Sequence, residues 1–89
     1  MKIKLELFGA SRDFSNKDLL EFNIKEKIKI KEFRKEIINY LEKKFHGNKD
    51  FTKIVETSVF CSEDNNIIND DYKISKDQRI GIIPPIGGG

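Results

Sequence analysis

The stretch that decides the fold is residues 30–45, which read IKEFRKEIINYLEKKF. Its apolar side chains recur every three or four residues, the spacing that places them along one face of an α-helix. These side chains are Ile30, Phe33, Ile37, Leu41 and Phe45. Gly47 follows where a left-handed C-terminal cap is expected, and Lys43 and Lys44 suit the negative end of the helix dipole. The pattern predicts one amphipathic helix of about four turns.

Upstream of this helix, apolar and polar side chains alternate with the period of a half-buried strand. The first alternating run is residues 2–8 (KIKLELF), and the second is residues 20–24 (LEFNI). Residues 9–16 between them are small and polar, which indicates a loop with at most a short helical turn. Because the connection is short, the two strands are expected to pair as an antiparallel hairpin.

Downstream of the helix the chain carries short apolar segments bounded by turn residues. Three of them are interpreted as strands: residues 58–61, 67–68 and 79–83. Asn65-Asn66 and residues 69–71 are the predicted turns. Residues 48–57 are polar with an apolar minority, and no regular element is predicted there. One helix packed on one face of a mixed sheet of four or five strands is an α+β layout.

Length and composition limit what the protein can be. Its 89 residues allow one domain, predicted as a body of residues 1–83 and an extended, flexible tail of residues 84–89. A net charge of +2 is too small for a nucleic-acid binder that neutralises phosphates. No apolar run is long enough to span a membrane, and the N-terminus lacks the apolar core of a signal peptide. A cytoplasmic protein is therefore expected.

Candidate catalytic side chains are few. His46 is the single imidazole, and a solvated position at the helix end is the simpler interpretation. Cys61 could relay sulfur as a persulfide, or it could be a small buried hydrophobic residue. The acidic pairs 63–64 and 70–71 are better turn residues than metal ligands, so no metal site is predicted. The basic run 25–35 is either a solvated helix face or a contact for an acidic partner.

The C-terminal tail is the most informative segment. Pro84-Pro85 ends the last strand, because neither residue can donate a ladder hydrogen bond. The proline pair also favours an extended backbone for the residues that leave the strand. Ile86-Gly87-Gly88-Gly89 follows, and Gly88 and Gly89 have the narrowest backbone that could thread a channel in another protein. The carbonyl of Gly89 has no side chain to crowd an attacking nucleophile. The pattern indicates a carrier whose reactive group is its own C-terminal carboxylate.

The ending IIPPIGGG (residues 82–89) resembles that of the molybdopterin synthase small subunits, a family of ubiquitin-like sulfur carriers. That family closes on two apolar residues, Pro-Pro, an aliphatic residue, a small residue and Gly-Gly, and here Gly87 takes the small-residue position. The segment LFGASRD (residues 7–13) is similar to the family's first loop, and the spacing of the apolar residues in 30–37 fits its helix. The resemblance implies the β-grasp fold.

Two positions depart from the family pattern. Asp77-Gln78 stands where Gly-Asp is usual, and Cys61 stands where Asn is common. Asp77 tolerates a left-handed turn, so the fold expectation is unaffected. The related carriers of the thiamine pathway also end in Gly-Gly but are usually shorter and lack Pro-Pro, so the ending favours the molybdenum cofactor pathway.

The resemblance implies a concrete chemistry for Gly89. A ubiquitin-activating-type adenylyltransferase would use ATP to adenylate its carboxylate, and a sulfur-donor protein would convert the adenylate to a thiocarboxylate. The tail would then enter the large subunit of molybdopterin synthase and give its sulfur to cyclic pyranopterin monophosphate, forming the dithiolene. The chain itself would bind no cofactor, would not be an enzyme alone, and would assemble with the large subunit as a heterotetramer.

Nine residues are predicted to contact these partners, either near the last strand or in the family-like first loop: Phe8, Arg12, Phe60, Ile82, Ile83, Pro84, Pro85, Ile86 and Gly87. Arg and aromatic side chains are typical interface anchors. Core packing is the alternative for the phenylalanines and the aliphatic residues. Arg12 is the stronger interface candidate, because a loop arginine has little structural duty.

Three other functions remain open at this point. The chain could carry sulfur for the thiamine thiazole, for a tungsten cofactor or for tRNA thiolation. It could be a modifier that is joined through Gly89 to lysines of target proteins. It could also be an interaction module with an inert tail, in which case deletion of Gly88 and Gly89 would change no activity.

Overall fold

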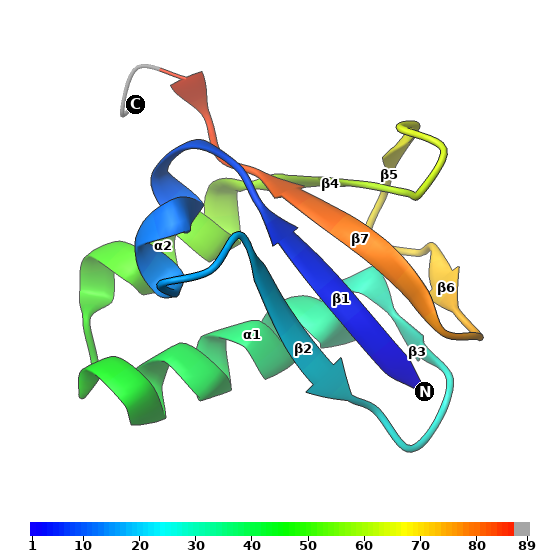
Figure 1. The fold of residues 1–89 in the computed structure, drawn as a ribbon, viewed down its shortest axis with the longest axis horizontal. Coiled ribbons are helices and arrows are strands. Elements are labelled where there is room, and N and C mark those ends of the chain that lie inside the picture. Colours follow the sequence, from blue (N-terminus) through cyan, green and yellow to red (C-terminus); the bar gives the residue numbers. More distant parts are fainter. Residues whose placement is uncertain (87–89) are drawn as a thin grey trace.

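The computed structural model describes residues 1–86. Its main sheet has five strands in the order β2-β1-β7-β4-β5, and a separate two-stranded sheet pairs β3 with β6 (Figure 1). The strands are β1 (Lys2–Leu7), β2 (Leu19–Asn23), β3 (Ile28–Lys29), β4 (Val59–Cys61), β5 (Ile67–Ile68), β6 (Lys73–Ile74) and β7 (Gln78–Ile83). One main helix covers one face of the mixed main sheet, which confirms the predicted α+β layout.

The last strand, β7, is the central strand of the sheet, and the first hairpin lies on one side of it. β1 pairs antiparallel with β2, as predicted, with Ile3 opposite Phe22. β1 also pairs in parallel with β7, and Leu7 lies opposite Ile82. Because β1 and β7 are parallel neighbours, the segments that follow them emerge at the same edge of the sheet. This is the edge where the C-terminal tail begins.

Helix α1 (Ile30–Phe45) packs on the sheet as its apolar spacing predicts (Figure 1). Four of its five predicted core side chains are fully buried, and Phe45 is half-buried. The helix ends at Phe45, and the two residues that follow, His46 and Gly47, both have left-handed backbone angles, φ 54° and φ 79°. The predicted cap at Gly47 is thus confirmed, and the helix end continues into a turn towards the next element.

The sequence prediction missed the second helix, α2 (Lys49–Thr57). Its first turn is capped by the Asn48 side chain, which accepts hydrogen bonds from the amides of Asp50 (3.0 Å) and Phe51 (3.2 Å). Phe51 then packs against Phe14, with ring centroids 5.1 Å apart, and against Phe45, at 4.8 Å. A helix of only nine residues has little stability of its own, so these tertiary contacts decide its existence.

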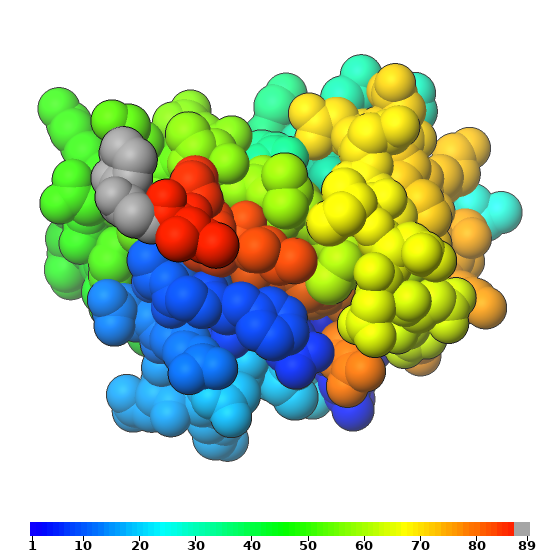
Figure 2. All heavy atoms as spheres, turned by 90° about the horizontal axis from the view of Figure 1, so that it is seen from above, coloured from blue at the N-terminus to red at the C-terminus, as the bar shows by residue number. Residues whose placement is uncertain are grey.

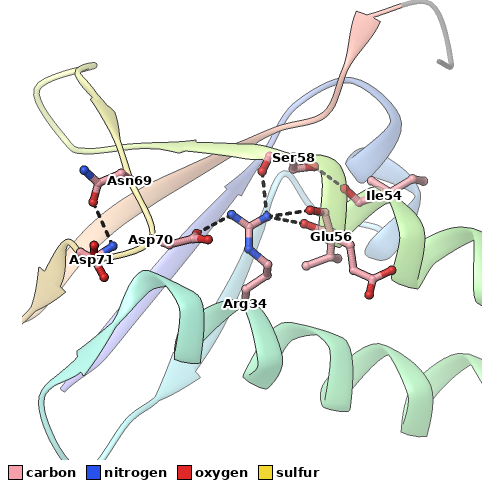
Figure 3. A network of polar contacts seen from close by, with 8 residues as sticks. Arg34, Ile54, Glu56, Ser58, Asn69, Asp70 and Asp71 are labelled. Carbon is pink, nitrogen blue, oxygen red and sulfur yellow. Dashed lines mark hydrogen bonds and ion pairs between the residues drawn. The ribbon is translucent and has the colours of Figure 1, made fainter.

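Arg34 ties α2 to the rest of the body (Figure 3). Its Nη1 donates to the carbonyl oxygens of Val55 (2.6 Å) and Ser58 (2.8 Å), at the C-terminal end of α2. Its Nη2 donates to Asp70 Oδ1 at 2.8 Å, in the turn before β6. The last carbonyls of a helix lack partners within the helix and carry negative partial charge, so a cation satisfies them well. One side chain of α1 thus fixes both α2 and the 69–71 turn.

Candidate functional site

The site predicted from the sequence lies where β7 ends. Pro84 is buried, Pro85 is exposed, and the side chain of Ile86 is 99% exposed. These three residues, 84–86, are called the tail root below. The predicted reactive residues Gly88 and Gly89, and the predicted contact Gly87, lie outside the described residues. The tail root is therefore the part of the site that can be placed in the fold.

The first loop of the chain packs against the end of β7. The 3-10 helix η1 (Gly9–Phe14) follows β1 directly, and confirms the short helical turn allowed by the sequence. Gly9 has φ +56°, and a Cβ built on it would lie 3.8 Å from Cδ of Pro84. Gly81 is packed more tightly, since a Cβ there would lie 3.1 Å from the Phe8 ring and 2.6 Å from Cys61 Sγ. The lack of a Cβ at Gly81 therefore lets the Phe8 ring and Cys61 Sγ lie close to β7 at this position.

A groove beside the tail root is lined by residues of both η1 and α2. Its volume is about 520 Å³, within the range of small binding pockets. Figure 2 shows the tail root between the blue η1 segment and the green α2 segment. The lining combines apolar side chains of α2 and the tail root with one acid and one base: Ala10, Asp50, Lys53, Ile54, Thr57, Pro84 and Pro85. The sequence did not predict this groove, because it did not predict α2, which contributes most of the lining residues.

An apolar surface lies on the sheet face opposite α1, beside the tail root. This surface, called the outer strip, comprises Phe8, Val59, Ile67 and Ile83. Val59 is 46% exposed and Ile67 is 66% exposed, whereas Phe8 and Ile83 are half-buried. The strand register makes the strip continuous, because Val59 pairs with Ile83 and Ile67 pairs with Cys61, next to Gly81 and Phe8. Adjacent exposed apolar side chains of this kind mark interaction sites.

Charged side chains occupy most of the rest of that sheet face, together with Leu19 of β2, which is 38% exposed and lies opposite Glu6. On β1, Lys2 lies 4.0 Å from Glu21 of β2, and Glu6 lies 3.4 Å from Arg79 of β7. Lys4 stands between them, directly opposite Arg79 in the register. Arg12, predicted as an interface residue, is exposed on η1. The face therefore has an apolar end near the tail root and a charged end away from it, an arrangement like the core and rim of a protein interface.

Two of the predicted contact residues are core residues instead. Phe60 and Ile82 are both fully buried, and the Phe60 ring packs 6.4 Å from that of Phe33 on α1. Side chains alternate between the two faces of a strand. The same alternation turns Val59 and Ile83 outward, into the outer strip. The prediction that Phe60 and Ile82 face a partner is corrected accordingly: core packing, its alternative, holds for both.

The other candidate chemical groups have structural positions. Cys61 is 8% exposed and packs beside Gly81, as a small buried hydrophobic residue does. Glu63 Oε1 accepts from the Arg79 amide at 2.9 Å, and Asp70 pairs with Arg34. His46 is exposed at the end of α1. Within residues 1–86, no three His, Cys, Asp or Glu side chains are grouped so that they could hold a metal ion.

Neither α1 nor α2 combines the length and the apolar character needed to cross a membrane, in the portion of the chain that the structure describes.

Known proteins resemble this chain in structure rather than in sequence. No family model and no curated protein sequence matches it. A Pyrococcus furiosus protein described as a molybdopterin converting factor, subunit 1, superposes with a TM-score of 0.69 at 18% identity, covering 96% of this chain and 98% of its own. The crystal structure of SAMP1 from Haloferax volcanii superposes with a TM-score of 0.69 at 10% identity, covering both chains fully. The helix and mixed sheet of this chain, together with these two structural matches, confirm the predicted β-grasp, ubiquitin-like fold.

Proposed function

We propose that this protein is a ubiquitin-like sulfur carrier, and that it serves as the small subunit of molybdopterin synthase. One observation carries the proposal. The central strand β7 leads into a buried Pro84 and then into Ile86, whose side chain is 99% exposed, immediately before Gly87-Gly88-Gly89. The base of the tail is thus held by the body, while the Ile86 side chain next to the glycines is accessible, which supports a tail that a partner could bind.

The proposed chemistry takes place at the carboxylate of Gly89. A carboxylate is a poor electrophile, so an adenylyltransferase first joins it to AMP from ATP and releases pyrophosphate. The terminal sulfur of a persulfide donor then attacks the acyl carbon and displaces AMP. A thiol of the donor protein cleaves the resulting acyl disulfide, which leaves a thiocarboxylate on Gly89 and a disulfide on the donor. The scheme requires that the mature chain ends at Gly89, which intact mass measures directly.

The thiocarboxylate sulfur is the proposed nucleophile of the next step. It would attack cyclic pyranopterin monophosphate in the large synthase subunit, and two carriers in a heterotetramer would serve two large subunits. Sulfur is softer and more nucleophilic than the oxygen it replaces, which suits this transfer. ATP would be bound by the adenylyltransferase and the acid–base groups would belong to the large subunit, so the carrier would hold no cofactor. We place this activity in the cytoplasm.

The outer strip supports the proposal that partners recognise the body as well as the tail. A tail of glycines loses about 1–2 kcal/mol of conformational entropy per ordered residue, so contacts elsewhere must contribute to binding. Val59 and Ile67 are exposed beside the tail root and can make such contacts. The fold is shared equally with a protein described as molybdopterin converting factor subunit 1 and with SAMP1, so the choice of the molybdenum pathway rests on the ending IIPPIGGG of residues 82–89.

Intact mass spectrometry tests this function. The purified chain is incubated with ATP, a cysteine-derived persulfide donor and the adenylyltransferase encoded in the same genome. The proposal predicts a gain in mass equal to the replacement of one oxygen by sulfur, mapped to Gly89 and absent from a variant that lacks Gly88 and Gly89. An unchanged mass, with an adenylyltransferase shown to be active on another carrier, would exclude the sulfur-carrier function and favour the interaction module.

The acceptor then separates the pathways. Transfer of the sulfur to cyclic pyranopterin monophosphate in the presence of the large subunit would establish the synthase role. Thiocarboxylate formation without that transfer would assign the chain to another sulfur pathway. Attachment of the chain to other proteins in denaturing gels would instead identify a modifier.

A further inference from the structure

We propose that the Phe8–Ser11 segment is a positioning element that sets the direction in which the C-terminal tail leaves the body. The inference rests on the proposed function, because direction matters only if the tail enters a partner. It concerns residues at the opposite end of the chain from the reactive group. Three contacts carry it, at Gly9, Phe8 and Ser11.

Strand topology brings the two segments together. β1 and β7 are parallel neighbours, with Leu7 opposite Ile82. The residues that follow them, Phe8 and Gly9 on one side and Pro84 on the other, therefore emerge side by side at one sheet edge. Figure 2 shows this contact from above, with the blue η1 segment against the tail root. The hairpin partner β2 lies on the far side of β1 and leaves this contact free.

Gly9 makes the contact with the tail root itself. Its φ of +56° lies in the left-handed region, which side chains with a Cβ rarely adopt. Gly9 lies beside the buried Pro84 ring, because a Cβ built on Gly9 would be at van der Waals distance from Cδ of that ring. The space there would admit a Cβ at 3.8 Å, so glycine is favoured by the backbone angle and not by crowding. The turn, rather than the size of the residue, is the feature that matters.

Phe8 and Ser11 hold the turn in place. The Ser11 hydroxyl donates to the Phe8 carbonyl at 2.6 Å and the Ser11 amide donates to the same oxygen at 3.2 Å. Ser11 is fully buried, although it belongs to a loop. The Phe8 ring packs against Gly81, three residues before Pro84. The segment thus contacts β7 both inside the strand and at the residue that ends it.

Fixing Pro84 fixes the direction of the residues that follow. Both prolines have a restricted φ, which limits the directions that the backbone can take between Pro84 and Ile86. The tail root then leaves between the outer strip and the groove beside α2. A ligand that is already oriented binds with a smaller entropic cost. We therefore expect this segment to affect KM of the adenylation step, and not kcat, because it touches no reacting atom.

The test compares four variants. Gly9→Val places a β-branched residue at a positive φ and should displace the turn. Gly9→Asn should restore the native arrangement, because Asn tolerates left-handed angles. Gly47→Val is the matched control: Gly47 also has a positive φ, +79°, nothing lies within 4 Å of its Cβ position, and it is at the end of α1. Ser11→Ala breaks the turn without changing any backbone preference at Gly9, and replaces Gly9→Val if that variant folds poorly.

Nuclear magnetic resonance on the isolated chain gives the first readout. In Gly9→Val or Ser11→Ala, the Gly9 to Pro84 proton contact should weaken and the Ile86 amide signal should shift. Both should remain native in Gly9→Asn and Gly47→Val. In the thiocarboxylation assay, kcat/KM should fall by about tenfold through KM in the first two variants.

Native Ile86 signals and native KM in both Gly9→Val and Ser11→Ala would overturn the inference. So would an equal change in Gly47→Val, since that would reflect lost stability and not positioning. If the wild-type chain is not thiocarboxylated, the proposed function fails, while the magnetic resonance comparison still decides whether the segment orients the tail root.

Discussion

The guanidinium of Arg34 lies 4.8 Å from the centre of the Phe60 ring, while its nitrogens bind carbonyls at the end of α2. A buried aromatic ring of the sheet and the end of a helix are thereby joined through one side chain of α1. The Arg34 side chain is 18% exposed, so its hydrogen bonds are largely shielded from water. This arrangement explains why α2 is stable although it is short.

Replacing Arg34 by Met should destabilise the protein by about 2–3 kcal/mol, because the carbonyls of Val55 and Ser58 lose a charged donor. Urea unfolding followed by circular dichroism measures the change. Lys35→Met, an exposed neighbour on the same helix, should change the free energy of unfolding by no more than about 0.5 kcal/mol. Equal losses in the two variants would show that the network in Figure 3 adds no stability.

Gly81→Ala should cost about 1–3 kcal/mol, since the new Cβ would lie 2.6 Å from Cys61 Sγ and 3.1 Å from the Phe8 ring. Removing the sulfur with Cys61→Ala relieves the closer of these contacts. The double variant should therefore lose less stability than the two single variants added together, by more than about 0.5 kcal/mol. Thermal unfolding of all four proteins completes the cycle, and strict additivity would contradict the predicted contact.

Asn48→Ala should destabilise the chain by about 1 kcal/mol, because two amides at the start of α2 lose their acceptor. Asn48→Asp should retain most of the stability, since a carboxylate accepts the same bonds and suits the helix dipole. Chemical unfolding is again the measurement. Asn16→Ala, in the exposed loop before β2, is the control and should have little effect on the free energy of unfolding. If Asn16→Ala loses as much stability as Asn48→Ala, the loss in Asn48→Ala is not explained by the helix cap.

If the proposed partner is the large synthase subunit, Ile67→Lys should weaken binding to it by about tenfold or more, because this substitution puts a charge into the outer strip. Calorimetry with a chain that lacks Gly88 and Gly89 isolates the contribution of the body. Asn39→Lys adds the same charge to exposed α1, on the other side of the sheet, and should bind as wild type. Unchanged affinity of Ile67→Lys for a subunit that binds the wild-type body would exclude the outer strip as the contact surface.

Local sequence patterns account for most of the fold. The spacing of apolar residues in α1, the alternation in β1 and β2 and the proline pair after β7 each depend on neighbours in the chain, and each was predicted. The paired two-residue strands β3 and β6 were not. Segments this short have no period to detect, and they are strands because Ile28 and Lys29 meet Ile74 and Lys73 across the structure.

The candidate site could also be predicted only in part. The sequence alone indicates a candidate tail, because prolines and glycines act through their own backbone geometry. Which side chains surround the tail root was not. In β4 and β7 both faces carry apolar residues. Alternation alone therefore could not predict which residue of each neighbouring pair is buried under α1: Phe60 and not Val59 in β4, and Ile82 and not Ile83 in β7.

The sequence by itself therefore determined the α+β layout, the place of the main helix and the proline pair at which β7 ends. Only the tertiary structure decided that Ile83 and Val59 face outward, that α2 exists and forms the groove, and that Gly9 lies against Pro84. The physical reason is the range of the forces. Periodicity and backbone restriction act within a few residues, whereas burial and close packing depend on which distant segments the parallel pairing of β1 and β7 brings together.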